Sequence, residues 1–175
     1  MNFESSLLKE LSLDSLKTYK EICSGSMFHT NFTVYAMNTT IYIVYVTGHG
    51  TLDFNLRDFP CETCTHDKEF LVIANGDFDE VGKCAFADWI SLKSVVLPPT
   101  IQRIGYRAFS DCDNLDSIIM PGHIQHIGEG AFDYTKPKAI YLYDDLPLND
   151  YLIDFFLKRD ITLMYNGLSV ALHRP

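Results

Sequence analysis

The chain has 175 residues, which suits one folded domain, and its 47% hydrophobic and 13% aromatic content supplies enough apolar surface for a core and excludes intrinsic disorder. Its net charge of −9 at pH 7 argues against binding to nucleic acid or anionic lipid, because both need a basic face. No run of residues approaches the roughly 18 apolar positions of a membrane-spanning helix, so we expect no membrane insertion.

The cysteines and the first residues bear on the cellular compartment. There are five cysteines, an odd number, and only Cys61 and Cys64 lie close together, which is not typical of a disulfide framework. Residues 1–10 lack both the basic region and the apolar run of a signal peptide. We therefore expect a reducing, cytoplasmic location, or a secreted or surface location if a leader has been removed.

The first third of the chain predicts a helix and then a β-hairpin. Residues 5–23 carry apolar side chains at helical spacings with one interruption, which indicates one helix or two short ones. Residues 31–37 and 40–47 alternate and are rich in β-branched and aromatic side chains, so they predict the two strands of a hairpin. Residues 53–67 have little periodicity and predict a loop.

An internal repeat dominates the middle of the chain. Residues 81–103 and 104–126 are both 23 residues long and share nine identities without a gap. A third copy begins at Ile127 and lacks one residue near Lys136. Half a unit, around Val72, precedes the two full copies. A single unit would leave its apolar face exposed, so the copies must stack on one another. The sequence predicts a short stack of about three repeats.

Positions within the repeat predict its internal geometry. Apolar residues that alternate and end at a proline indicate a short strand with one face toward the core. A glycine such as Gly105 indicates a backbone turn that a side chain would obstruct. The phase of the repeat predicts that the rings of Phe86, Phe109 and Phe132 stack as one interior ladder.

These units resemble the BspA-like leucine-rich-repeat family, whose repeat runs roughly IGxxAFxxCxxLxxIxLPxxL. The resemblance is specific over residues 72–146 and weaker over 46–54, which look like the strand and G-x-G segment before the first repeat. Cys112 matches the cysteine of the family repeat, whereas Trp89 stands at that position one unit earlier. The resemblance implies a right-handed solenoid, a role in adhesion or recognition, and no catalytic residues.

The predicted fold is therefore of the α+β class, a short right-handed leucine-rich-repeat solenoid in a single domain, residues 1–175. Residues 1–69 form an N-terminal cap with a helix and a β-hairpin, and residues 70–146 form the repeats. Residues 147–175 form a C-terminal cap, with a helix over 149–159 and a strand over 161–165.

Few side chains suggest chemistry. Cys61, Cys64 and His66 form the one cluster with metal-like spacing, but structural zinc sites usually use two such pairs, so ordinary loop cysteines are the preferred interpretation. We predict that the Cys112 thiol is buried and inert and that Trp89 is interior. The protein is expected to be non-enzymatic and to need no cofactor. A metal- or thiol-dependent protein centred on the cluster remains an alternative.

The predicted binding site is the face of the strands that points away from the core, because side chains alternate along a strand. β-branched residues suit strands in any case, but a contiguous apolar strip on a protein surface also marks contact surfaces. We therefore predict a protein partner on this face, and the other alternative is a structural or self-associating unit that forms a homo-oligomer. One outward column is wholly apolar (Ile73, Val96, Ile119 and Tyr141), and a second column holds Leu71, Ser94, Ser117 and Ala139.

Overall fold

The computed structural model describes residues 13–27, 29–54, 67–142, 150–165 and 168–170, and most of its regular structure is strand. Two helices are described, α2 (Leu13–Leu16) and α3 (Asp150–Arg159). The strands are β1 (Lys20–Met27), β2 (Thr30–Ala36), β3 (Ile41–Leu52), β4 (Glu69–Ala74), β5 (Asp77–Val81), β6 (Leu92–Val96), β7 (Arg103–Ile104), β8 (Ser117–Met120), β9 (His126–Ile127), β10 (Ala139–Leu142), β11 (Thr162–Tyr165) and β12 (Leu168–Val170).

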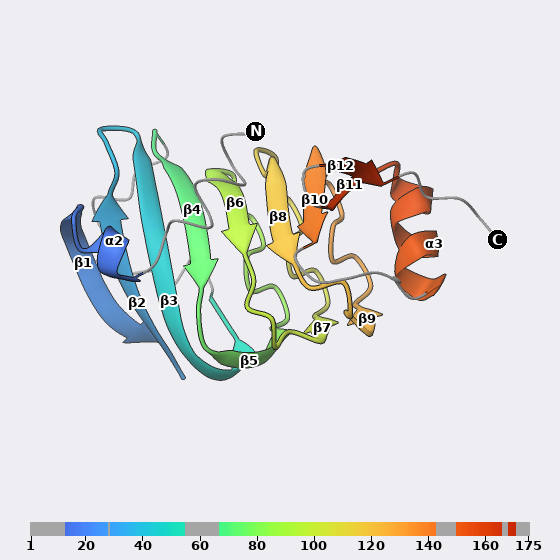
Figure 1. Cartoon of the computed structure of the whole chain (residues 1–175), viewed down its shortest axis with the longest axis horizontal. Helices are drawn as coiled ribbons and strands as arrows, with labels where there is room; N and C mark the ends of the chain where they lie inside the picture. The colour runs from blue at the N-terminus through green and yellow to red at the C-terminus, as the bar shows by residue number, and fades with distance from the viewer. Residues whose placement is uncertain (1–12, 28, 55–66, 143–149, 166–167, 171–175) are drawn as a thin grey trace.

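The strands form two columns that share β3 (Figure 1). Sheet A runs in the order β1-β2-β3-β4-β6-β8-β10-β11-β12, and all its neighbours from β3 to β11 are parallel. The far end of β3 pairs with β5, and β7 and β9 follow, so this second column is sheet B. The register pairs Val72 with Val95 and Val95 with Ile118, 23 residues apart each time. The period of the sequence is therefore the step between neighbouring strands.

A third set of hydrogen bonds joins the repeats on the side opposite sheet A. The Phe86 N–H donates to the Ala108 carbonyl at 2.8 Å, and the Phe109 N–H donates to the Ala131 carbonyl at 2.8 Å. The chain reaches this geometry by placing two residues per repeat at positive φ, a region that side chains with a Cβ disfavour. These residues recur every 23 positions, at Cys84, Arg107 and Gly130 and again at Asp88, Asp111 and Tyr134.

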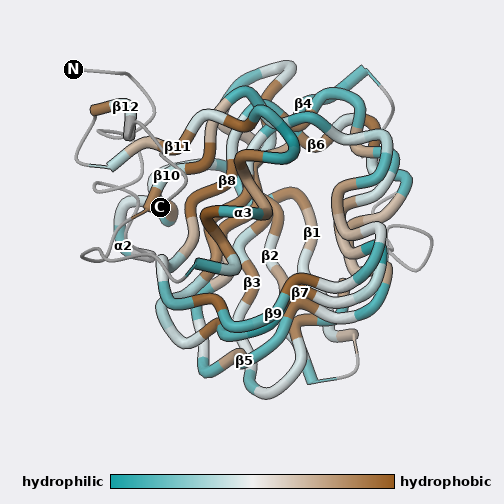
Figure 2. The backbone as a smooth tube through the Cα atoms, turned by 90° about the vertical axis from the view of Figure 1, so that its right-hand side faces the viewer, coloured by the Kyte–Doolittle hydropathy of each residue, from teal (hydrophilic) through white to brown (hydrophobic). Residues whose placement is uncertain are grey.

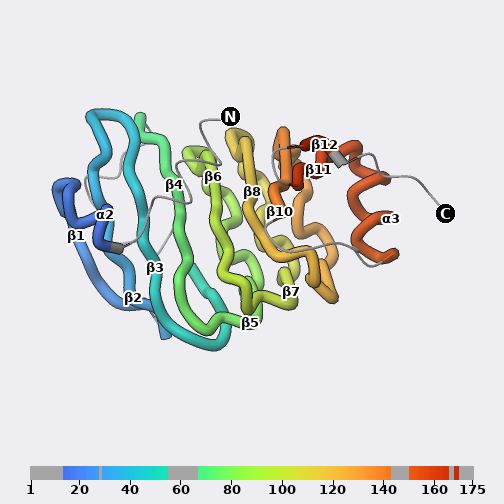
Figure 3. Tube along the Cα trace, in the orientation of Figure 1, coloured from blue at the N-terminus to red at the C-terminus, as the bar shows by residue number. Residues whose placement is uncertain are grey.

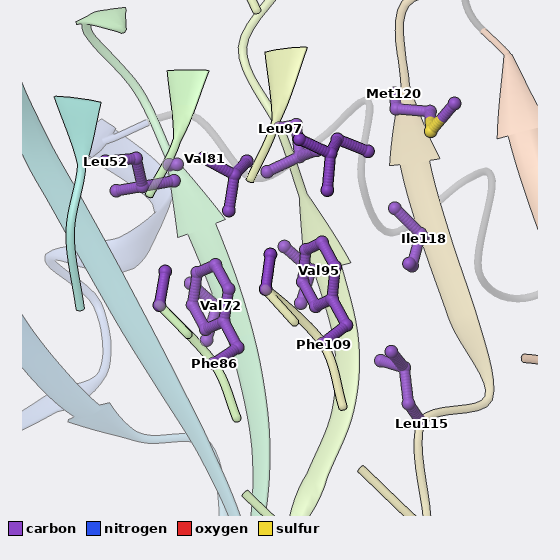
Figure 4. Packing of buried hydrophobic residues seen from close by; sticks show 14 of the residues in the cluster. Leu52, Val72, Val81, Phe86, Val95, Leu97, Phe109, Leu115, Ile118 and Met120 are labelled. Atoms are coloured by element: carbon purple, nitrogen blue, oxygen red, sulfur yellow. The ribbon is translucent and has the colours of Figure 1, made fainter. Parts of the chain in front are cut away.

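The core lies between these columns and is filled by aligned side chains, as predicted. The Phe86 and Phe109 rings stack at 5.1 Å and 4° between planes, and Phe109 and Phe132 stack at 5.5 Å and 13°. Figure 4 shows Phe86 and Phe109 among the buried side chains. All three residues are buried, so the interior ladder is confirmed. Trp89 is also interior, and it stacks on Phe54 at a centroid distance of 5.6 Å.

One glycine per repeat allows neighbouring backbones to approach closely. A Cβ on Gly105 would lie 2.7 Å from the Val81 carbonyl oxygen, and one on Gly128 would lie 2.6 Å from the Gly105 carbonyl carbon. Real Cβ atoms do not approach backbone so closely, so these positions require glycine. The obstruction predicted at Gly105 is confirmed.

The two ends of the stack differ. The antiparallel strands β1 and β2 lie at one end, and α3 lies across the other, as the tube views show (Figures 2 and 3). On α3, Leu152 and Phe156 are fully buried in the main core. The Phe155 ring lies 5.9 Å from that of Phe132, so α3 extends the phenylalanine ladder beyond the last repeat.

Several expectations about the ends are corrected or extended. The predicted hairpin is present as β2 and β3, and the predicted final helix and strand are present as α3 and β11. Of the helix or two short helices predicted over 5–23, residues 5–12 lie outside the described residues and α2 covers Leu13–Leu16. The prediction is wrong beyond Leu16, because β1 pairs with β2 over its whole length. Gly25 suits this strand, since a Cβ there would lie 2.8 Å from the Phe32 ring. The strand β12, antiparallel to β11, was not expected from the sequence.

Candidate binding face

The side of sheet A that points away from the phenylalanine ladder, here the outer face, carries the two predicted columns. Backbone register aligns Ile73 with Val96, Val96 with Ile119 and Ile119 with Tyr141. The same register continues to Tyr45 on β3 and Met164 on β11. We call the six aligned residues the apolar row: Tyr45, Ile73, Val96, Ile119, Tyr141 and Met164. The row crosses six neighbouring strands of sheet A.

The N-terminal part of this face is covered by α2. Leu16 of α2 is 0% exposed and forms a second hydrophobic cluster with Tyr35, Ile43, Tyr45 and Ile73. Figures 1 and 2 show α2 on this side of β2 and β3. The prediction that Ile73 belongs to an exposed surface is therefore wrong, because Ile73 is only 7% exposed.

The second column, Leu71, Ser94, Ser117 and Ala139, is also not an open surface. Ser94 is 9% exposed and Ser117 1% exposed, so both serines are buried. Their hydroxyl groups lie 2.8 Å apart and hydrogen-bond to each other across β6 and β8. Leu71 is half-buried and packs against the cluster around Leu16. The polar atoms of this column therefore hold neighbouring strands together, which differs from the predicted binding role.

The accessible part of the apolar row lies nearer the C-terminal end. Val96, Ile119 and Tyr141 are half-buried, and so is Met164 on the next strand. Val96 is partly buried and packs against the cluster around Leu16. Among the described residues, this contact is the limit of the surface that α2 covers. The four predicted residues of the first column therefore lie in one row, but Ile73 is buried and the other three are half-buried.

Charged side chains line the start of the same strands. The Lys93 ammonium lies 3.6 Å from the Glu69 carboxylate and 3.7 Å from that of Asp116. The Lys138 ammonium lies 2.7 Å from the other oxygen of Asp116. Charges of alternating sign therefore run across the starts of β4, β6, β8 and β10, three or four residues before the members of the apolar row. An apolar centre with a polar rim is the usual anatomy of a protein–protein interface.

Other candidate chemistry is mostly structural. Cys112 is buried, and its thiol donates to the Phe86 carbonyl at 3.0 Å, while burial raises the pKa of that thiol to about 12. Such a thiol is a poor nucleophile, because the thiolate is the reactive form. Cys61, Cys64 and His66 lie outside the described residues. Within the described ranges, no group of three His, Cys, Asp or Glu side chains could hold a metal ion.

Sequence reasoning missed the extension of the outer face over β3 and its cover by α2. The alternation over 41–46 was a usable signal, because Ile43 and Tyr45 must share a face once Val44 and Val46 point into the core. The burial of Leu16 had no comparable signal, because it depends on a contact with strands far along the chain.

Comparison with known proteins fits this geometry. A family model described as a BspA type leucine rich repeat region (6 copies) matches residues 64–157, more than half of the chain. The chain belongs to this family. Members of leucine-rich-repeat families are commonly protein-interaction modules and are typically non-enzymatic. No curated protein sequence matches the chain.

One solved structure has a similar fold. It is the crystal structure of a leucine-rich repeat protein from Eubacterium ventriosum, with a TM-score of 0.53 and 14% sequence identity over 73% of this BspA-type chain. The match covers 39% of that protein, and at this identity it supports the fold alone. Among the described residues, no helix combines the length and hydropathy needed to cross a bilayer.

Proposed function

We propose that this BspA-type chain is a non-enzymatic protein-interaction module that binds a protein partner through the accessible part of its apolar row, Val96, Ile119 and Tyr141 with Met164. The observation that carries the proposal is the alignment of these residues on adjacent strands of sheet A. Apolar, aromatic and sulfur-containing side chains are enriched at the centres of protein interfaces, and contiguous apolar patches on a folded protein mark contact surfaces. The ion pairs around Lys93 would form the polar rim.

The same proposal includes the finer architecture. Residues 70–146 would be a short right-handed solenoid that serves as a rigid platform, with residues 1–69 as its N-terminal cap and 147–175 as its C-terminal cap. The contacts of α3 with Phe132 support the second cap. A bare terminal repeat would expose its core, which is why such stacks need ends of a different kind.

The test exchanges two residues of the row for charges. Val96→Glu with Ile119→Lys keeps the net charge and places both changes on the half-buried outer side of the sheet. The matched control is Gln102→Glu with Gln125→Lys, which has the same spacing and the same new side chains on exposed positions near sheet B. Both proteins should keep the wild-type circular dichroism and melting behaviour.

Quantitative affinity purification then compares the three full-length proteins. We expect a protein that is enriched by the wild type and the control and lost in the double variant, with a dissociation constant at least tenfold weaker in the purified pair. Light scattering of the isolated chain detects self-association on the same face. A partner that binds the double variant as tightly as the wild type would show that the apolar row is not the binding site.

A further inference from the structure

Two exposed histidines face each other at the end of the stack that holds β1 and β2. The antiparallel register of β2 and β3 pairs Thr30 with Gly48, so its next step places His29 directly opposite His49. The two imidazole rings stack with their centroids 5.7 Å apart and 27° between their planes. Both side chains are exposed, and neither belongs to the phenylalanine ladder or to the apolar row.

The backbone around this histidine pair is fixed on both sides. The buried Thr30 hydroxyl group donates to the Met27 carbonyl at 2.6 Å and so ties the end of β1 to the start of β2. On β3, Gly48 has a φ of +153°, and a Cβ at this position would collide with the His29 carbonyl oxygen. His29 therefore lies directly against β3 only because residue 48 is glycine. The folded backbone, without any ligand, sets the spacing of the two imidazoles.

This spacing suits two ligands of one metal ion. Imidazole nitrogens bind zinc at about 2.0–2.1 Å, so the centroids of two imidazoles on one tetrahedral ion lie about 5–5.5 Å apart. The centroids of His29 and His49 are 5.7 Å apart, so rotation of the exposed side chains is enough to bring one nitrogen of each ring to a shared ion. Imidazole is the commonest metal ligand in proteins and suits Zn²⁺, Cu²⁺ and Ni²⁺.

The surroundings of the pair favour a cation. The register partner of His49 on β5 is Asp77, so an exposed carboxylate follows the two imidazoles in the same row, in a chain of net charge −9. A Cβ on Gly50 would meet no atom within 4 Å, so the space beside His49 is open to water. Within the described ranges no group of three His, Cys, Asp or Glu side chains could hold a metal ion. Asp77 therefore contributes charge, and water completes the coordination.

We propose that His29 and His49 form an open two-imidazole site for a divalent transition-metal ion of the Zn²⁺, Ni²⁺ and Cu²⁺ class. The remaining positions on the ion hold water, which a ligand from another molecule can replace. The ion joins the start of β2 to β3 and stabilises this end of the stack, because it binds the folded chain in preference to the unfolded one. Folding does not require the ion, since hydrogen bonds of the chain itself set the register and the turn.

The test titrates Zn²⁺ into the full-length protein under reducing conditions, with calorimetry as the measurement. Two single variants, His29→Gln and His49→Gln, each remove one imidazole and leave a polar amide at an exposed position. The matched control is His123→Gln with His126→Gln, which removes two exposed imidazoles elsewhere. Circular dichroism checks that all four proteins keep the same fold.

We expect the wild type and the control to bind one Zn²⁺ ion that both single variants bind at least about tenfold more weakly, because the second imidazole of the pair binds intramolecularly. Zn²⁺ should also raise the melting temperature of the wild type and the control more than that of the single variants. Zn²⁺ held by Cys61, Cys64 and His66 would contribute equally to all four proteins and cancel. Equal affinities in the wild type and both single variants would overturn the proposal.

Nitrogen-15 spectra of the imidazoles locate the ion in the unsubstituted protein. Zn²⁺ should shift one ring nitrogen of His29 and one of His49 in step with occupancy. Saturation with Zn²⁺ that leaves either histidine unshifted would place the ion elsewhere and refute the site. A Zn²⁺-dependent dimer, detected by light scattering and absent in both single variants, would mean that the imidazoles share ions between molecules, and the internal site would be wrong.

This inference and the proposed function fail separately. The site does not use the apolar row, so Val96→Glu with Ile119→Lys should leave Zn²⁺ binding unchanged. Loss of Zn²⁺ binding in that variant, with its fold intact, would contradict the placement of the ion at His29 and His49.

Discussion

The Tyr151 hydroxyl group forms two hydrogen bonds with Ile127. It accepts one from the backbone N–H at 3.0 Å and donates one to the backbone carbonyl at 2.8 Å. Ile127 belongs to β9, the last strand of sheet B in the described column. One side chain of α3 therefore pairs both backbone polar groups of Ile127 at this strand edge. An unpaired strand edge is a template for association with other chains, and Tyr151 blocks it here.

The first prediction removes this contact. Tyr151→Phe should lower the free energy of unfolding by about 0.5–1.5 kcal/mol, since water can reach part of the freed backbone. Urea denaturation measures the loss. The substitution should also accelerate hydrogen exchange more at the Ile127 amide than at the Ile104 amide. Tyr134→Phe is the control, because Tyr134 is 83% exposed and should change nothing measurable. An unchanged exchange rate at Ile127 would mean that the hydroxyl does not protect this edge.

The second prediction concerns the phenylalanine ladder. Phe109→Ala should cost about 3–5 kcal/mol, because the ring is fully buried and stacks on both Phe86 and Phe132. Tyr106→Ala, three residues earlier and 40% exposed, should cost far less. Chemical denaturation of both variants provides the measurement. A cost below about 1 kcal/mol for Phe109→Ala would contradict the register of the stack.

How far the sequence predicts the fold depends on which interactions repeat. The ladder, the glycines and the strand register follow from a strict 23-residue period, because a stacked unit meets its own copy at the same position each time. Strand β1 does not repeat, and its conformation depends on pairing with β2 and on the space that Gly25 leaves for Phe32. Local helical spacing was therefore overridden by a tertiary partner.

The candidate site shows the same division. Alternation correctly aligned Val96, Ile119 and Tyr141 on one face, because direction along a strand is a local property. Exposure is not local. Ile73 is buried because Leu16 packs over it. Ser117 is buried as well, although alternation along β8 places its side chain on the outer face. No pattern within a repeat records what another part of the chain places on top of it.

The third prediction compares equivalent glycines in successive repeats. Gly105→Ala should destabilise the protein by about 1–3 kcal/mol, since the new methyl group would meet rigid backbone at Val81. Gly82→Ala should cost less, because its nearest neighbour is the Thr51 side-chain methyl group at 3.1 Å, which can move. Melting temperatures of the two variants give the comparison. If both variants lose the same stability, close backbone approach is not what selects glycine at this position.

The last prediction concerns pH and the Cys112 thiol. Burial raises the pKa of this thiol from its ordinary value of 9.0 to about 12, so between these values the unfolded chain releases a proton that the folded chain keeps. Deprotonation then favours the unfolded state. The stability that Cys112 contributes is complete below pH 9 and is lost as the pH rises toward 12, at no more than about 1.4 kcal/mol per pH unit.

Cys112→Ser isolates this effect, because a serine hydroxyl can still donate to the Phe86 carbonyl but does not titrate in this range. The difference in unfolding free energy between the wild type and Cys112→Ser should be constant from pH 7 to about 8.5 and shrink steadily above it. Urea unfolding under reducing conditions at several pH values measures the difference, with Cys84→Ser, at a half-buried position, as the comparison. Other groups that titrate above pH 9 affect both proteins alike and cancel. A difference that stays constant up to pH 10.5 would mean that the buried thiol ionises in the folded state as readily as in the unfolded one.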